Sequence, residues 1–313
     1  MERAKTFDNF YSTYIEPQLE ELNRQDKDAD HWGTIMIFAI LAAAASFILM
    51  FAVEASWNGG LITFLLGAFA VFSIYKYTQK DDNYTDNFKD NVIATIIKYI
   101  DPEFAYKPGN MVPSREYVSS GLFRKRYDYI DGDDFIEGTY KNVHFHCSEL
   151  HTYKTGGRSS TSDITIFKGL FFAAAVNAGF RGGTYIWSKD DEQLASSIAD
   201  ERYRLLPLPQ VSGVAIGDPL FDQYYSMCTT MPPDAKKIID NGIPGKLLQF
   251  RQQIKRKVVF SVVAGKCYVA IPISEDLLEP NTPAGDREEV KKYFYTILLI
   301  LNIINQLNLE GLQ

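Results

Sequence analysis

Two long apolar segments near the N-terminus constrain what this chain can fold into more than any other feature. Residues 34–53 are twenty residues without a charge, and residues 61–77 are apolar apart from Lys76. A helix of about twenty residues is about 30 Å long, which matches the hydrocarbon core of a bilayer. The short connection between the segments allows only an antiparallel return, with turn residues at 58–60. We therefore predict a transmembrane helical hairpin over residues 32–78.

Aromatic and basic residues flank the two spans. Trp32, Trp57, Tyr75 and Tyr77 lie at the span ends, where aromatic rings prefer the membrane–water interface. The turn between the spans has no lysine or arginine, whereas both outer flanks have several. Because basic flanks stay on the cytoplasmic side, we expect both termini in the cytoplasm and only the turn outside. Small residues on both spans allow close helix packing, either within the hairpin or in a homo-oligomer.

The net charge and the cysteine count argue against two classes of protein. The chain has a formal net charge of −7, whereas nucleic-acid-binding domains normally present a basic surface, so we expect no nucleic-acid partner. Its 3 cysteines are widely spaced, which suits a reducing compartment rather than a disulfide-stabilised secreted protein. Residues 1–31 carry apolar side chains at helical spacing, so we predict a cytoplasmic amphipathic helix before the first span.

Residues 79–313 mix strand and helix signals without strict alternation, which is typical of α+β domains. We predict a cytoplasmic domain with an antiparallel or mixed sheet and flanking helices. The expected elements are helices over 82–100 and 114–123, a strand meander over 127–154 with turns at Asp131-Gly132 and Lys141-Asn142, strands over 164–176 and 183–188, a short helix within 190–203, a strand pair over 211–230, helices that begin at Pro232 and Pro244, a hairpin across Ala264-Gly265, and a helix over 286–309. The last helix is very apolar, but its amide side chains disfavour a third span.

The segment NVHFHCSELHTY, residues 142–153, contains three of the four histidines. On a strand, His144 and His146 point to one face and Cys147 to the other, where an unreactive core thiol is expected. Two imidazoles could share a metal ion, but a catalytic zinc needs a third ligand and His151 has the opposite parity. The segment is therefore either a metal site with these three histidines as candidates or, as the pattern favours, an ordinary strand.

The remaining segments contain no recognised catalytic motif. The acidic run DYIDGDDF lacks EF-hand spacing, and the glycine-rich TGGRSSTSD lacks the GK[ST] of a P-loop. Two basic clusters stand out: Arg124, Lys125 and Arg126, and Arg251, Lys255, Arg256 and Lys257. Such clusters either contact anionic lipid or another anion, at about 1 kcal/mol for each basic residue near a membrane surface, or are solvated surface.

Five short segments occur in an order that resembles a known family. They are GLF (121–123), YIDGDDFIEG (129–138), CSEL (147–150), IFKGLFF (166–172) and DLLEP (276–280). The order is similar to that of the bacterial domain of unknown function 3137 family, over roughly residues 80–310, and the two N-terminal spans also fit. The resemblance implies an uncharacterised bacterial inner (plasma) membrane protein. The family has no assigned activity, so no catalytic residue and no cofactor are implied.

The sequence favours a binding module over an enzyme. In this interpretation, the inner-membrane hairpin contacts the lipid bilayer and anchors a cytoplasmic domain that binds a protein or membrane partner. Two alternatives stay open. One is a membrane-tethered, metal-dependent hydrolase that uses the His144/His146 face. The other is an oligomeric membrane effector or small channel, although the uncharged spans disfavour a hydrophilic pore.

Overall fold

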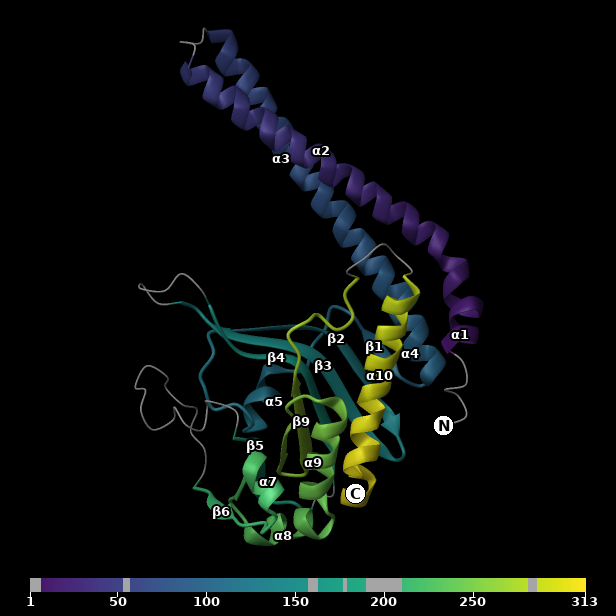
Figure 1. Cartoon of the computed structure of the whole chain (residues 1–313), viewed down its shortest axis with the longest axis vertical. Coiled ribbons are helices and arrows are strands. Elements are labelled where there is room, and N and C mark those ends of the chain that lie inside the picture. The colour runs from purple at the N-terminus through teal and green to yellow at the C-terminus, as the bar shows by residue number, and fades with distance from the viewer. Residues whose placement is uncertain (1–6, 53–56, 157–162, 177–178, 190–209, 281–285) are drawn as a thin grey trace. The chain divides into compact units, whose positions relative to one another are not determined.

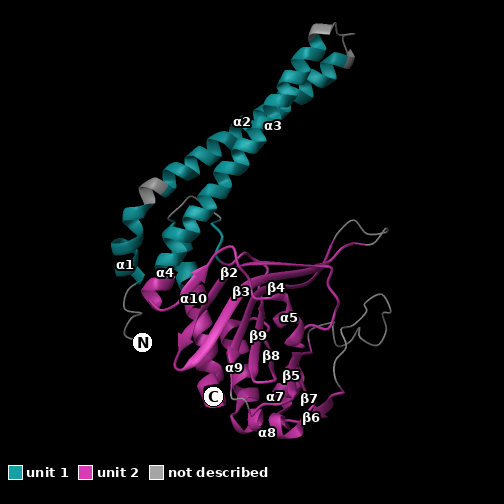
Figure 2. Ribbon diagram, turned by 180° about the vertical axis from the view of Figure 1, so that it is seen from behind, with its two compact units in different colours: residues 1–96, 278–294 teal, residues 97–277, 295–313 magenta. Residues whose placement is uncertain are grey.

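The computed structural model describes residues 7–52, 57–156, 163–176, 179–189, 210–280 and 286–313. The chain divides into two compact units, which are coloured separately in Figure 2. The hairpin unit comprises residues 1–96 and 278–294, and the sheet unit comprises residues 97–277 and 295–313.

Helices make up the hairpin unit. Its described elements are α1 (Phe7–Phe10), the π-helix Tyr11–Ile15, the 3-10 helix Glu16–Gln18, α2 (Leu19–Ala52), α3 (Trp57–Phe88), the π-helix Lys89–Ile93 and the start of α4 (Ala94–Ile100). The predicted boundaries after residues 31 and 78 fall inside α2 and α3, because each helix continues unbroken from polar into apolar sequence.

The long helices α2 and α3 run side by side in opposite directions (Figure 1). Small and polar side chains lie between them: the hydroxyl oxygens of Ser46 and Thr63 are 2.8 Å apart, and Ala39 and Ala70 are buried. The ring of Tyr77 lies so close to Gly33 that a Cβ there would be 3.1 Å from it. These contacts confirm a helical hairpin and assign part of its small-residue surface to the pairing of α2 with α3.

The turn of the hairpin differs from the prediction. Residues 58–60 were expected to form it, but α3 already begins at Trp57. The connection itself, residues 53–56, lies outside the described residues.

Aromatic packing joins the N-terminal segment to the rest of the hairpin unit. Phe7 and Phe10 lie 5.8 and 5.5 Å from Phe294, centroid to centroid. The segment therefore packs on the first turns of α10 (Arg287–Leu307) and also leads into α2.

One antiparallel sheet forms the centre of the sheet unit, as the α+β prediction required. The nine described strands are β1 (Ala105–Lys107), β2 (Tyr129–Tyr140), β3 (Val143–Lys154), β4 (Ile164–Ala175), β5 (Gly183–Ser188), β6 (Ser212–Val214), β7 (Tyr225–Thr229), β8 (Val259–Val263) and β9 (Lys266–Pro272). Their order is β1-β2-β3-β4-β9-β8-β5-β7-β6, and each of these strands is antiparallel to its neighbours. The last two strands in the chain, β8 and β9, thus lie between β4 and β5 in the sheet.

Helices cover both faces of this sheet. The short helix α5 (Ser114–Ser119) packs on one face, where Tyr117 joins a buried cluster with Phe167, Phe171 and Tyr268. On the opposite face, α9 (Ile243–Ile254) and residues 295–307 of α10 lie over the strands (Figure 1). Alternating strand residues are therefore buried on both sides, which explains the continuous apolar run in β4.

Turn chemistry fixes the two tight hairpins of the sheet. Lys141 and Asn142 between β2 and β3, and Ala264 and Gly265 between β8 and β9, all have positive φ, as two-residue hairpin turns require. Both hairpins were predicted. The remaining described helices are α7 (Pro219–Tyr224), α8 (Pro232–Asp240) and the 3-10 helix Leu309–Leu312.

Three local predictions have different outcomes. Asp131-Gly132 is not a turn but lies within β2, because Asp131 pairs with His151 across the sheet. Residues 219–224 form a helix rather than a strand, because the Asp218 side chain accepts hydrogen bonds from the N–H groups of Leu220 and Phe221. The helix expected within 190–203 lies outside the described residues.

Candidate functional site

The histidines of β3 have separate partners. His146 points toward α5, where its Nε2 lies 3.1 Å from a carboxylate oxygen of Glu116. The other carboxylate oxygen of Glu116 is 3.1 Å from the Lys266 ammonium group. His144 is exposed, with its Nδ1 3.4 Å from the hydroxyl oxygen of Thr139, and the Nε2 of His151 is 3.1 Å from that of Thr165.

These three imidazoles do not converge. Among the described residues, no group of three metal-binding side chains includes a histidine. The proposed ligand set of His144, His146 and His151 is thus spread along the strand, and His146 engages a carboxylate instead. Cys147 is fully buried on the opposite face, and burial raises the pKa of its thiol, so it is an unreactive core side chain as strand parity predicted.

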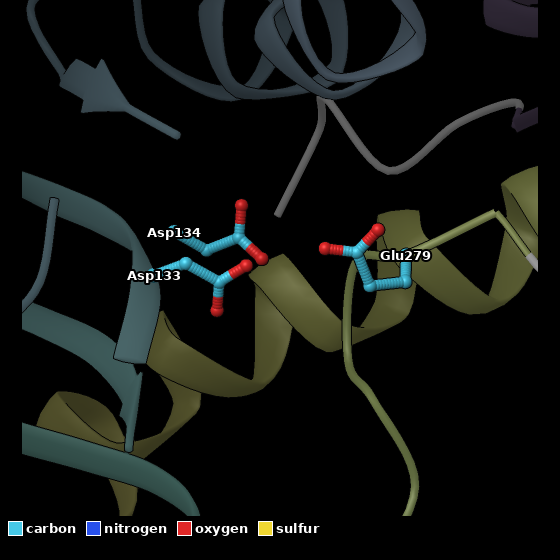
Figure 3. A group of neighbouring side chains, drawn as sticks. All are labelled: Asp133, Asp134 and Glu279. Carbon is cyan, nitrogen blue, oxygen red and sulfur yellow. The ribbon is translucent and has the colours of Figure 1, made fainter. Parts of the chain in front are cut away.

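Acidic side chains gather where β2 bends. Asp133 and Asp134 are neighbours on β2 (Figure 3), at a register shift in its pairing with β3. Asp134 is buried with φ at 57°, and the Tyr106 hydroxyl donates to its carboxylate at 2.5 Å. Glu279, also labelled in Figure 3, belongs to the hairpin unit, where its carboxylate lies 2.5 Å from the buried Lys89 ammonium group.

Glu149 is another buried carboxyl group of the sheet unit. It pairs directly opposite Asp133, is 7% exposed, and accepts a hydrogen bond from the N–H of Leu277 at 2.8 Å. The pKa of Glu149 is raised to about 7, chiefly by burial and to a smaller extent by the nearby carboxylates of Asp133 and Asp276, against the lowering effect of the Leu277 hydrogen bond. Its role here is to hold the chain after β9 against β3.

The second basic cluster surrounds a hollow at the C-terminal end of α9. The hollow has a volume of about 370 Å³, and its lining residues are Tyr224, Arg251, Gln252, Lys255, Arg256 and Lys257. The guanidinium group of Arg251 stacks over the Tyr224 ring, 4.6 Å from its centroid, and donates a hydrogen bond to the Ser188 hydroxyl at 3.2 Å. All four cations that the sequence grouped as the second basic cluster line this hollow.

A second hollow of about 380 Å³ shares Arg256 and Lys257 with the first. Its wall also contains Lys168 of β4, Thr165 and Ser274. Lys168 donates to Asp276 at 2.6 Å, and this hydrogen bond raises the pKa of the lysine. Sequence reasoning missed Lys168, because only the sheet order β4-β9-β8 brings it beside the start of β8.

The first basic cluster lies apart from these hollows. Arg124, Lys125 and Arg126 line neither of them, although the preceding Phe123 lines the second. Arg124 and Lys125 are half-buried and Arg126 is exposed. The structure therefore separates two clusters that the sequence treated alike.

The aromatic residues expected at the membrane interface lie on α2 and α3. Trp32 packs edge-on against Phe72, with ring centroids 6.0 Å apart, and Tyr75 is exposed. Tyr77 covers Gly33. The side chain of Trp57 lies outside the described residues. Two helical stretches, Leu22–Met50 and Gly59–Ile100, are long and apolar enough to cross a membrane.

Comparisons with known proteins give one family and one distant structure. No curated protein matches the chain. The crystal structure of the mycobacterial trehalose monomycolate transport factor A, TtfA, is similar at a TM-score of 0.31 and 10% identity, over 65% of this chain and 88% of that one. Residues 165–309 match the family model described as "Protein of unknown function (DUF3137)". This range contains Lys168 and the Arg251–Lys257 cluster but not the histidines of β3, so the chain is similar to the DUF3137 family over the part that carries the basic cluster.

Proposed function

We propose that this protein is a membrane-anchored binding module of the bacterial inner membrane. In this proposal α2 and α3 span the bilayer, both termini lie in the cytoplasm, and the sheet unit binds a partner. The observation that carries it is the exposure of apolar side chains on the hairpin: Phe38, Ile48, Phe64 and Val71 are 67–72% exposed. A continuous apolar surface of this kind is unfavourable in water and favourable in hydrocarbon.

The polar groups of the apolar stretch support the same proposal. The Thr63 hydroxyl donates to the Gly59 carbonyl at 3.0 Å, and the Ser73 hydroxyl donates to the Phe69 carbonyl at 2.8 Å. A bilayer core offers no water to pair with such groups, so their partners must come from the helices themselves. The hairpin meets this requirement at both positions.

Polar contacts between α2 and α3 support the proposed orientation, in which both termini lie in the cytoplasm. Near the sequence ends of the spans, Lys80 lies 3.4 Å from Asp28, and the Asn87 amide donates to Gln25 at 2.9 Å. These pairs belong to the side of the hairpin that carries lysine and arginine, which the positive-inside rule assigns to the cytoplasm. An inward-facing sheet unit also suits its buried free thiols at Cys147 and Cys267.

The sheet unit is proposed to bind rather than to catalyse. Its histidines are dispersed and two of its thiols are buried, whereas its basic side chains line concave hollows. Concave sites with a few oriented polar groups are typical of ligand binding.

Membrane extraction and reporter fusions test this proposal in cells. We expect the full chain to stay in the membrane pellet at alkaline pH. A reporter inserted at Asn58 should be active only outside the cytoplasm, and one fused after Gln313 only inside. Release by alkaline carbonate would contradict the anchor, and an external C-terminus would contradict the orientation.

A further inference from the structure

We propose that the two hollows that share Arg256 and Lys257 form one binding site for a soluble, phosphorylated small molecule. This inference deepens the proposed binding function by naming the chemical class of the ligand. It rests on the charge, the rigidity and the shape of the two hollows.

The charge of the site is one-sided. Among the described residues that line the two hollows, five are cations, namely Lys168, Arg251, Lys255, Arg256 and Lys257, and none is a carboxylate. Two of these cations contact acids outside the lining: Arg256 is 3.5 Å from Glu275, and Lys168 is paired with Asp276. The described lining of the two hollows is thus basic or neutral, in a chain whose net charge is −7.

Arg251 is held in place before any ligand arrives. Its guanidinium group stacks on Tyr224, lies 5.7 Å from the Tyr225 ring centroid, and donates to Ser188. A guanidinium held by stacking and a hydrogen bond loses little conformational entropy when an oxyanion binds to it. Arg251 is therefore a built part of the site rather than a mobile surface side chain.

Lys255 is held in an unfavourable backbone conformation. It follows α9 with φ at 53° and ψ at 31°, the left-handed region in which glycine is preferred after a helix. A lysine there costs about 1 kcal/mol relative to glycine. Among the described residues, none pairs with its ammonium group. A strained, unpaired cation in the wall of a hollow points to a ligand.

The shape of the site favours a small molecule over a lipid surface. The hollows of about 370 and 380 Å³ fall in the size range of small-molecule sites. Arg251 and Lys257 are half-buried within them, so a flat bilayer surface would not reach both groups. Thr165, Ser274 and Gln252 add neutral donors. Clustered guanidinium and ammonium groups with hydroxyl donors suit the multiple oxygens and charges of phosphate.

Isothermal titration of the full chain in phosphatidylcholine nanodiscs, with inorganic pyrophosphate as the probe, tests the site. We expect saturable binding to the wild type, weakened about tenfold or more by Lys255→Gln and by Arg251→Gln, since each removes a charge-assisted hydrogen bond. Lys255→Gln is the decisive variant because its side chain is exposed, whereas Arg251→Gln also removes packing on Tyr224. The matched control Lys236→Gln, an exposed lysine of α8, should bind like the wild type.

The same titration contains the results that would overturn the site. The proposal fails if pyrophosphate does not bind, if Lys255→Gln binds as the wild type does, or if succinate binds equally well. It also fails if binding occurs only to nanodiscs that contain phosphatidylglycerol and pyrophosphate does not compete, because the ligand is then the lipid surface. Insertion of these variants into membranes is measured separately, so loss of the site leaves the proposed anchor intact.

Discussion

The hairpin helices and α10 are built from the same kinds of residue but expose them in opposite ways. In the sheet-unit part of α10, Ile297, Ile300 and Ile303 are at most 3% exposed. On α2 and α3, Phe38 and Phe64 are 68% and 72% exposed. Apolar composition alone therefore does not distinguish a core helix from a membrane-spanning helix.

The distinction comes from the pattern of polar residues. Lys292 and Asn305 are exposed on α10, so its polar residues define a solvent face opposite the buried isoleucines. Over residues 34–52, α2 contains no charged residue. A helix with one apolar face needs a protein core, and a helix that is apolar all round needs lipid or complete burial.

The largest effect should come from truncating the buried face of α10. Ile303→Ala leaves a cavity in the sheet unit and should lower the free energy of unfolding by about 2–5 kcal/mol. The matched change Ile48→Ala, on the exposed surface of α2, should alter it by less than about 0.5 kcal/mol. Urea unfolding in detergent, followed by Trp187 fluorescence with Trp32 and Trp57 replaced by phenylalanine, measures both. An equal decrease in the free energy of unfolding for the two variants would contradict the difference in burial between α10 and α2.

A charge should be tolerated less well on the hairpin than its exposure suggests. Phe64→Lys places an ammonium group within the second span and should disfavour insertion by about 3 to 4 kcal/mol. The exposed Tyr129→Lys change in β2 provides a control with the same new charge on the sheet unit. The membrane-inserted fraction is the measurement. Unchanged insertion of Phe64→Lys would mean that this surface faces water or protein.

The buried carboxyl group of Glu149 should make the stability of the protein depend on pH. The pKa of Glu149 is raised from 4.5 to about 7, so the folded chain keeps a proton that the unfolded chain releases. The resulting stabilisation is complete below about pH 4.5, declines as the pH rises, and is lost above about pH 7. Linkage puts the total at about 3 kcal/mol.

Glu149→Gln removes this dependence, because an amide does not ionise and can still accept from the Leu277 N–H. Melting of the full chain between pH 4.5 and 8 should show a flatter stability profile for this variant than for the wild type. Glu137→Gln, a change in a more exposed carboxyl group of β2, should keep the wild-type slope. A wild-type slope in Glu149→Gln would assign the pH dependence to other groups.

The smallest effect should be a gain in stability at the basic site. Lys255→Gly relieves the left-handed strain after α9 and should stabilise the sheet unit by up to about 1 kcal/mol. Lys255→Ala keeps the strain and should not. A melting temperature that rises in Lys255→Gly but not in Lys255→Ala would support a strained backbone at Lys255. Equal melting temperatures for the two variants would show that the lysine is not strained.

Local sequence patterns, such as helix-start and turn residues, predicted much of the fold. The proline-initiated helices α8 and α9 and the hairpins at Lys141-Asn142 and Ala264-Gly265 appear where turn and helix-start chemistry placed them. The same reasoning failed at Asp131-Gly132, because cross-strand pairing overrides a turn propensity. It also missed α7, although an aspartate before a proline is a recognisable helix start.

The sequence by itself determined the apolar hairpin, since helix length and the absence of charge depend only on neighbouring residues. It also located the cations at 251–257. Tertiary structure alone decided that Lys168 joins them, that Glu149 is buried beside Asp133, and that the β3 histidines stay apart. The reason is physical: insertion of β9 and β8 beside β4 brings together residues far apart in the chain, and no local pattern records that order.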